Sequence, residues 1–439
     1  MIATISKRGL RANLLIRDAR VVDPAQGIDT RADVLIEKGQ IAAIEPAGKG
    51  KAEGLEMVEA GGSLLLPGFV DLHAHLRTPG REDEEDIASG TRAAAAGGYV
   101  AVCAMPNTDP VVDNAAVLQS LVEASESEAA VRVAFLGSIS RAQEGVHLSD
   151  MWDLAHAGAV AFSDDGRPVS DGGLLLSAFE AARLVGLPLS LHCEDTDIAG
   201  GGVMNEGEVS ARLGLAGIPA AAETASVAAA LETAAYAAGR VHIAHVSCGR
   251  SAQLIESARR AGAQVTCEVT PHHLALTESK IEAGLDSSFK MNPPLRTEAD
   301  RQALVAALAA GTIDCVATDH APHASQEKEV PFEEAPFGVI GLETAFPVLY
   351  SRLVDTGELA LETLIMAMST NPARAFALPV PALAAGAEAN LTLVDTEEEF
   401  DIVPDDFKSK SRNTAFAGWR VKGRVLLTLA AGRLAYRRP

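Results

Sequence analysis

The middle of the chain alternates between short, almost continuous apolar runs and longer alanine-rich stretches. Such runs are typical of strands buried on both faces of a parallel sheet, and the stretches between them are typical of helices. Eight repeats favour closure of the sheet, so we predict a (β/α)8 barrel of the TIM type. The predicted strands cover residues 64–76, 99–107, 131–140, 159–165, 187–194, 241–247, 264–272 and 313–320. Clear helices between them cover residues 86–96, 173–185, 222–238 and 299–309.

The two ends of the chain have a different pattern, in which short segments typical of antiparallel strands alternate with Gly and Asp turns. Each end alone has too few strands to bury a core. We therefore predict that both ends form one small β-sandwich domain (residues 1–66 plus 378–439) beside a catalytic barrel (residues 67–377). Its predicted strands include residues 12–16, 32–36, 40–44, 389–394 and 424–429.

Length and composition fit a two-domain globular enzyme, since a barrel needs about 250 of the 439 residues. The net charge of −22 argues against binding to nucleic acid or to anionic membranes, but it does not restrict a small substrate. Residues 1–8 lack the apolar stretch of a signal peptide, so we expect a cytoplasmic protein. The five cysteines show no CxxC spacing and fit core positions in a reducing compartment.

Two histidines end the first predicted barrel strand, in the string Asp71-Leu72-His73-Ala74-His75. Alternate residues of a strand point to the same face, so His73, His75 and Arg77 should project together. One metal ion can bind both imidazoles, with the guanidinium of Arg77 beside it. A single histidine is more often structural, but a pair at this spacing on an apolar strand favours a metal site.

Most of the other predicted strands also end in residues that can bind metals or transfer protons. The active site of such a barrel lies at the carboxyl ends of its strands, so these residues should converge. Four histidines with two carboxylates would suit two zinc ions about 3.5–4 Å apart. The strings are Met105-Pro106-Asn107-Thr108, Phe162-Ser163-Asp164-Asp165-Gly166, Leu191-His192-Cys193-Glu194-Asp195, Val241-His242-Ile243-Ala244-His245 and Thr318-Asp319-His320-Ala321-Pro322-His323.

Some positions in these strings allow more than one interpretation. His242 and His245 have opposite parity, so a regular strand can direct only one of them inward. His245, nearer the carboxyl end, is the better candidate, and His242 fits a hydrogen-bonded structural role. The pattern alone leaves the choice between Asp164 and Asp165 open. Residues 270–273 fit capping and packing at least as well as catalysis.

Taken in chain order, these strings resemble the bacterial class I dihydroorotases of the amidohydrolase superfamily. The resemblance covers most of the chain and is far more specific than the histidine pair alone. Besides the strings above, it is carried by Leu76-Arg77, Met291-Asn292-Pro293-Pro294-Leu295-Arg296 and Ala335-Pro336-Phe337-Gly338-Val339-Ile340-Gly341-Leu342-Glu343-Thr344-Ala345.

The resemblance implies a role for each site residue. Arg77, Asn107 and His323 would hold a substrate carboxylate, while Asn292 and the backbone of residues 337–338 would contact the substrate ring. The implied metal ligands are His73, His75 and Asp319 for one zinc ion and His192 and His245 for the second, with Asp165, rather than Asp164, bridging both. The implied substrate contacts are His75, Arg77, Asn107, Asn292, His323, Phe337 and Gly338.

The same resemblance implies a reaction, the reversible zinc-dependent cyclisation of N-carbamoyl-L-aspartate to L-dihydroorotate in pyrimidine biosynthesis. During ring opening, Asp319 would take a proton from the attacking water and return it to the ring nitrogen. We expect the loop of residues 321–336, rich in charge and proline, to close over the ring.

Two alternatives have a different activity. An allantoinase or hydantoinase would share the barrel and metals, but hydantoinases bridge their metals with a carbamylated lysine, and residues 159–166 contain no lysine. An inactive dihydroorotase-like subunit would only scaffold aspartate carbamoyltransferase, but it should have lost metal ligands, and this chain retains all six. We expect a homodimer. The sequence leaves open whether an active enzyme also binds the transferase. Thr78, where relatives often carry an acidic residue, affects only local packing.

Overall fold

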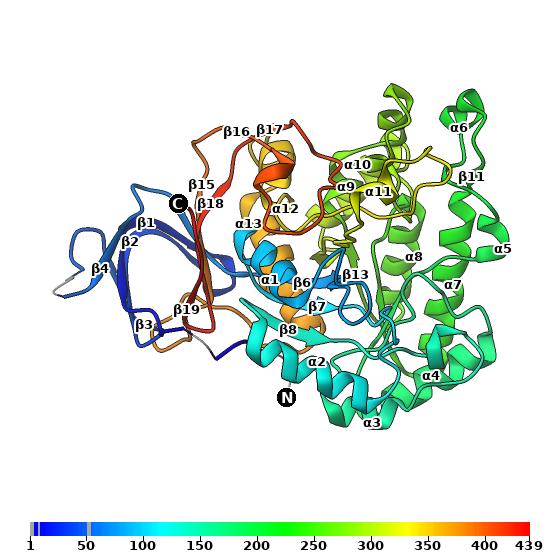
Figure 1. The fold of residues 1–439 in the computed structure, drawn as a ribbon, viewed down its shortest axis with the longest axis horizontal. Helices are drawn as coiled ribbons and strands as arrows, with labels where there is room; N and C mark the ends of the chain where they lie inside the picture. The colour runs from blue at the N-terminus through cyan, green and yellow to red at the C-terminus, as the bar shows by residue number, and fades with distance from the viewer. Residues whose placement is uncertain (1–3, 8, 51–53) are drawn as a thin grey trace.

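The computed structural model describes residues 4–7, 9–50 and 54–439, so parts of the predicted N-terminal segment (residues 1–3, 8 and 51–53) lie outside the described residues. Figure 1 shows a curved sheet beside the C-terminal end of the chain and, next to it, a larger unit of strands and helices. Among the described residues, no helix is both long enough and apolar enough to cross a bilayer.

Strands from both chain ends pair in one eight-stranded sheet, in the order β19-β18-β15-β5-β1-β2-β3 with β4 paired to β1. The predicted antiparallel pairing is confirmed for β1 with β2, β2 with β3 and β15 with β18, but β1 also pairs in parallel with β4 and with β5. The strands are β1 (Leu14–Asp23), β2 (Ile28–Glu37), β3 (Gln40–Pro46), β4 (Glu56–Glu59), β5 (Leu64–Pro67), β15 (Leu391–Asp395), β18 (Arg424–Ala430) and β19 (Arg433–Arg437).

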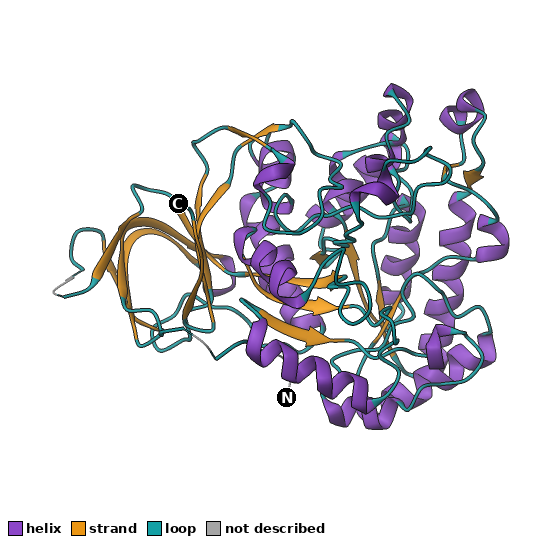
Figure 2. Ribbon diagram, viewed as in Figure 1, coloured by secondary structure: helices purple, strands orange, loops and turns teal. Residues whose placement is uncertain are grey.

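An apolar cluster explains why the two ends fold together. Ile16 on β1, Val34 on β2 and Leu65 on β5 pack in the same cluster as Leu391 on β15 and Leu427 on β18, and all five are buried. Strands that lie far apart in the pairing order thus contribute to one core, so the sheet curls around it (Figure 2). Neither end has enough apolar surface to form this core alone.

The larger unit is built on parallel strands, as the continuous apolar runs predict. Isolated parallel bridges extend the pairing: Phe162 joins Gly137 to Leu189, and Ala74 pairs with His320. One sheet contains β6 (Phe69–Ala74), β7 (Tyr99–Ala104) and β8 (Arg132–Phe135), and the other contains β9 (Leu189–Leu191), β12 (Arg240–Ile243), β13 (Gln264–Val269) and β14 (Cys315–Val316).

Helices lie between and outside these strands (Figure 2). The four helices predicted from periodicity agree with α1, α4, α7 and α10 to within two residues at each end. The longer helices are α1 (Ile87–Ala96), α2 (Ala115–Glu128), α3 (Met151–Ala157), α4 (Gly172–Val185), α7 (Ala220–Ala237), α8 (Gly249–Arg260) and α10 (Glu298–Ala309), and the short α12 (Ala345–Leu349) continues as a π-helix over Tyr350–Val354.

The predicted barrel strands are too long. Residues 159–165 form only bridges at Phe162, and β14 covers two residues of the predicted run 313–320. The predicted strand 64–76 is in fact two strands, because β5 belongs to the terminal sheet and β6 to the larger unit. They separate at Gly68, where an added Cβ would lie 2.2 Å from Cγ1 of Val100.

The C-terminal segment of residues 399–421 leaves the terminal sheet and packs on the larger unit. It contains β16 (Phe400–Asp401) and β17 (Arg420–Val421), which Figure 1 shows above α12. Phe416 of this segment is buried in a cluster with Met291 and Val339. Residues that the sequence assigns to the small domain therefore reach the surroundings of the predicted site.

Phe69 begins β6 and provides a test of this packing. Its buried ring lies 5.1 Å from the ring of Phe346 and 5.7 Å from that of Tyr99. Replacement of Phe69 by Ala should lower the free energy of unfolding by about 3–5 kcal/mol, because it leaves a cavity. Leu434→Ala, at a half-exposed position, should change it by less than about 0.5 kcal/mol. Urea denaturation would measure the free energy of unfolding of both variants. Equal changes in the two would contradict the packing of Phe69 described here.

Candidate metal centre

The two histidines of the predicted pair lie side by side, with ring centroids 5.3 Å apart. β6 ends at Ala74, so His75 belongs to the following loop, where its backbone N–H donates to the carbonyl of His320. His73 Nδ1 donates to Glu268 Oε1 at 3.0 Å, and His75 Nδ1 donates to Asn107 Oδ1 at 2.9 Å. These acceptors hold the Nδ1 proton, which leaves each Nε2 lone pair for a metal.

A second pair consists of His192, after β9, and His245, after β12. His192 Nδ1 lies 2.9 Å from His245 Nε2, and the ring centroids are 4.7 Å apart. His245 has a positive φ of 32°, so it does not continue β12 as a regular strand residue. His242 bonds instead to Thr266 Oγ1 at 2.8 Å and to Glu268 at 3.0 Å, the hydrogen-bonded structural role predicted for it.

The carboxylate of Asp165 lies between these two histidine pairs. Its Oδ1 is 3.4 Å from Nε2 of His73, 3.4 Å from Nε2 of His245 and 3.7 Å from Nδ1 of His192. Its Oδ2 is 3.6 Å from Nε2 of His75. Burial would raise the pKa of this carboxyl, but the surrounding imidazoles of His73, His245 and His75 outweigh burial and hold the pKa well below its usual range.

The neighbouring Asp164 has a different role. It accepts hydrogen bonds from the backbone N–H of Ile139 at 2.8 Å and of Ser140 at 3.1 Å, so it fixes the loop after β8. Burial raises the pKa of Asp164 to about 6, despite the hydrogen bonds from Ser140 and Ile139. The two adjacent aspartates therefore point to different surroundings, and only Asp165 contacts the histidines.

Asp319, which follows β14, faces the first histidine pair. Its Oδ1 lies 3.1 Å from Nε2 of His75 and 3.5 Å from Nε2 of His73. Its backbone has a positive φ of 48°, so the chain turns out of the strand direction at this residue. Burial raises the pKa of Asp319, but the neighbouring imidazoles of His73 and His75 outweigh it and lower the pKa well below its usual range.

The donor set fits two metal ions that share one carboxylate. His73, His75 and Asp165 present ligand atoms within 4.8 Å of one another, and so do Asp165, His192 and His245. The buried Nε2 of His73 has no hydrogen-bond partner, as expected for a ring nitrogen that binds a metal. All ligands are nitrogen or oxygen atoms, the set that zinc binds in catalytic sites without thiolate.

Glu268 on β13 is a functional residue that the sequence reasoning missed. Its two carboxylate oxygens accept from His73 Nδ1 and from His242 Nε2, each at 3.0 Å. Burial alone would raise its pKa, but these two histidines lower the pKa to about 2, so Glu268 stays ionised as an acceptor. The signal was an acidic residue within the apolar strand Gln264–Val269, which requires a buried partner.

Arg77 lies near the site but not on the strand face from which it was predicted. It follows the end of β6 and has a positive φ of 57°. Its Nε and Nη2 donate to the carbonyl of Pro322 at 3.1 and 2.9 Å, and Nε forms an ion pair with Glu84 at 2.9 Å. Strand alternation therefore does not explain its position. Its acidic neighbour is Glu84.

The remaining predicted substrate contacts surround the same region. His323 Nε2 donates to the carbonyl of Phe337 at 2.8 Å, and its Nδ1 lies 3.5 Å from Glu84. Asn292 Nδ2 donates to Glu194 at 3.1 Å, and Glu194 in turn lies 3.4 Å from His192 Nε2. Glu194 thus supports both a metal-ligand candidate and a substrate-contact candidate, a role that the sequence did not indicate.

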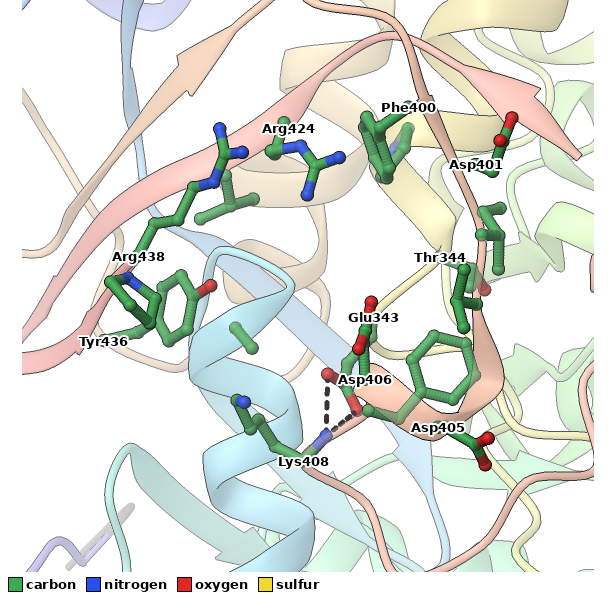
Figure 3. Close-up of a pocket in the computed structure, with 17 residues that line it drawn as sticks. Glu343, Thr344, Phe400, Asp401, Asp405, Asp406, Lys408, Arg424, Tyr436 and Arg438 are labelled. Atoms are coloured by element: carbon green, nitrogen blue, oxygen red, sulfur yellow. Dashed lines mark hydrogen bonds between the residues drawn. The ribbon is translucent and has the colours of Figure 1, made fainter. Parts of the chain in front are cut away.

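A separate pocket of about 440 Å³ shows that concavity alone does not locate this site. Figure 3 shows that pocket, which lies between the C-terminal strands and the segment around residues 400–408. Glu343, Arg424 and Tyr436 line it, and none of the predicted site residues does. The histidines and carboxylates above are identified by their mutual distances instead.

Comparisons with known proteins agree with this arrangement. A family model described as dihydro-orotase-like matches residues 62–251. The chain is 45% identical to the dihydroorotase of Geobacter sp. (strain M21) over 426 residues, and this alignment covers 97% of this chain and 99% of that protein. It is also 45% identical over 428 residues to the dihydroorotase of Geobacter metallireducens (strain ATCC 53774 / DSM 7210 / GS-15), covering 97% and 100%.

Solved structures share the fold at lower identity. The L-hydantoinase (dihydropyrimidinase) from Arthrobacter aurescens superposes with a TM-score of 0.86 at 26% identity, over 97% of this chain and 96% of that chain. The dihydropyrimidinase from Brevibacillus agri NCHU1002 does so with a TM-score of 0.84 at 24% identity, over 97% and 95%. Since sequence relatives match at 45% identity over nearly the whole length, the chain belongs to the dihydroorotase family.

Proposed function

We propose that this protein is a dihydroorotase that catalyses the reversible cyclisation of N-carbamoyl-L-aspartate to L-dihydroorotate. The observation that carries the proposal is the position of Asp165 between two histidine pairs, in a chain of the dihydroorotase family. The hydantoinase alternative is not favoured, because residues 159–166 contain no lysine and the sequence relatives are dihydroorotases. The aspartate at position 165 also supports assignment to class I.

We infer that the centre holds two zinc ions per chain. His73, His75 and Asp319 would bind one ion, His192 and His245 the other, and Asp165 both. When bound, such a pair of ions lowers the pKa of a shared water and polarises the carbonyl under attack. The buried carboxylate of Glu268 would keep the His73 ring oriented, because it accepts the Nδ1 proton.

The proton must travel from the attacking water to the ring nitrogen that leaves. Asp319 is our candidate for this transfer, since its carboxylate faces the Nε2 atoms of His73 and His75 from one side of the centre. It would act as base when the water attacks and as acid when the ring nitrogen departs. In the cyclisation direction the same group would act in reverse order.

The substrate carboxylate would be held by Arg77, Asn107 and His323, and the ring would contact Asn292 and the backbone of residues 337–338. Arg77 supports this role because a guanidinium can bind a carboxylate with two parallel hydrogen bonds. In the structure it is paired with Glu84, so we infer that a substrate carboxylate would share or replace this partner. His75 would contact the substrate as well as the metal.

We further infer that the parallel strands close into a (β/α)8 barrel. The bridges at Phe162 and His320 support closure, because they join the two parallel sheets at both edges. The domain boundaries proposed above, 1–66 plus 378–439 and 67–377, follow the two sheets, apart from residues 399–421. Four expectations stay predictions: that the terminal strands form a β-sandwich, that the protein is a homodimer, that it binds a carbamoyltransferase, and that it is cytoplasmic.

The metal ligands can be tested through stoichiometry. The protein purified without chelator should contain about two divalent ions per chain by elemental analysis. Asp165→Asn should reduce the content of both ions, because its carboxylate is shared. Asp164→Asn provides the matched control, since Asp164 bonds only to the loop after β8, and it should retain both. Full activity without metal would overturn this centre.

The activity can be tested on the purified chain. It should open the ring of dihydroorotate, and the loss of ultraviolet absorbance measures this ring opening. Asp319→Asn should reduce kcat by on the order of 10² or more, because it removes the basic site while keeping the shape of the side chain. Its metal content must be measured alongside. Turnover close to that of the unmodified chain would show that the proton takes another route.

Substrate selection can be tested at Arg77. Arg77→Met should abolish most activity on dihydroorotate and reduce its preference over dihydrouracil, which has the same ring without the carboxylate. Arg81→Met is a matched control, because Arg81 also pairs with Glu84 but is half exposed. It should keep the preference. If Arg77→Met loses both substrates equally, the carboxylate is recognised elsewhere.

A further inference from the structure

Lys328 is a buried cation whose hydrogen-bond partners are all backbone carbonyls. It ends the short helix α11 (Ser325–Lys328). Its Nζ donates to the carbonyls of Pro336 at 2.8 Å, Gly338 at 3.0 Å and Lys290 at 3.5 Å. Among the described residues, no carboxylate forms an ion pair with it. Burial is the main reason that its pKa falls to about 8, with a smaller effect from the charge on Lys290.

Two of the three carbonyls, those of Pro336 and Gly338, flank Phe337 in the sequence, and the third, that of Lys290, is bonded to the same turn. The Gly338 N–H donates to the carbonyl of Lys290 at 2.9 Å, and the Gly338 carbonyl also accepts from Asn413 Nδ2 at 3.2 Å. The Phe337 carbonyl accepts from His323 at 2.8 Å. Within the described part of the chain, this leaves the N–H of Phe337 as the one backbone polar group of residues 337–338 without a partner.

The free N–H and the carbonyl of Pro336 belong to the same peptide group. A donor that holds the carbonyl fixes the plane of the peptide and polarises it, which makes the N–H at the other end a stronger donor. The positive φ of Gly338, 126°, also limits this turn to one geometry that few other residues adopt. Lys328 thus controls both the direction and the strength of the Phe337 N–H.

We propose that Lys328 is a positioning residue for substrate binding, which orients and polarises the Pro336–Phe337 peptide so that the Phe337 N–H donates to a carbonyl oxygen of the substrate ring. This inference rests on the proposed function, in which the backbone of residues 337–338 contacts the ring. It assigns to a buried lysine, which is not itself among the proposed metal or substrate contacts, the reason that this backbone presents a single free donor.

Lys290 offers a matched control. It is also buried, but its Nζ donates to one carbonyl outside this turn, that of Glu333, at 2.8 Å. It lies over the rings of Phe332 and Phe337 and does not hold the carbonyl of Pro336 or of Gly338. If Lys328 only stabilised the loop, changing either lysine should have the same effect. If Lys328 orients the Phe337 N–H, only its replacement should affect that donor.

The experiment compares Lys328→Met, Lys328→Arg and Lys290→Met at about pH 7, where the ammonium is charged. Lys328→Met should raise KM for dihydroorotate on the order of tenfold with little change in kcat, because it weakens a contact made in both ground and transition states. Hydrogen exchange of the Gly338 amide should accelerate in the same variant. Lys328→Arg, which keeps charge and donors, should recover part of both effects, and Lys290→Met should show neither.

Each other outcome has a distinct meaning. Faster exchange with an unchanged KM would overturn the role in substrate binding and leave Lys328 as a structural contact. Unchanged exchange in Lys328→Met, or equal effects in Lys290→Met, would overturn the positioning of the peptide itself. An unmodified chain that fails to open dihydroorotate would refute the proposed function instead, a result that is visible before any variant is compared.

Discussion

The constraint on which the site depends is that one buried carboxylate, that of Asp165, must face four imidazoles at once. These rings lie at or just beyond the ends of strands β6, β9 and β12, so three strands that are separate in the sequence must end close to the same point. Concentrating so many polar groups in the interior is unfavourable unless each has a partner. Glu268, Asn107 and Glu194 supply partners for three of the four rings, because each contacts the ring nitrogen of His73, His75 or His192 that points away from Asp165.

Local periodicity was sufficient to predict α1, α4, α7 and α10, since an alanine-rich amphipathic stretch has few other conformations available. It could not predict where strands end, because strand length is set by partners distant in the chain. The run 64–76 is uniformly apolar, and its division at Gly68 results from the close approach of Val100, a residue of the neighbouring strand. The parallel pairing of β1 with β5 likewise depends on long-range contacts.

In the site, spacing alone pointed to His73 and His75, which the structure places side by side. Parity favoured His245 over His242, and the structure places His245 beside Asp165, although His245 lies beyond the end of β12. The choice of Asp165 over Asp164 needed the family resemblance, because adjacent residues differ only in the loops that they face. The position of Arg77 was derived from a strand that ends before it. The acidic Glu268 within a buried strand indicated that a partner exists, but its local sequence could not identify that partner, and the same holds for the backbone partners of Lys328.

The segment of residues 399–421 also has a consequence for synthesis on the ribosome. Asn413 bonds to the carbonyls of Ala321 and Gly338, and β15 and β18 complete the sheet that β1 and β5 begin. The N-terminal strands therefore have no finished sheet to join until almost the entire chain has been made. Domains usually fold in order from the N-terminus during translation. In this protein the C-terminal strands and Asn413 must emerge before either the terminal sheet or the backbone at Ala321 and Gly338 can assume its folded form.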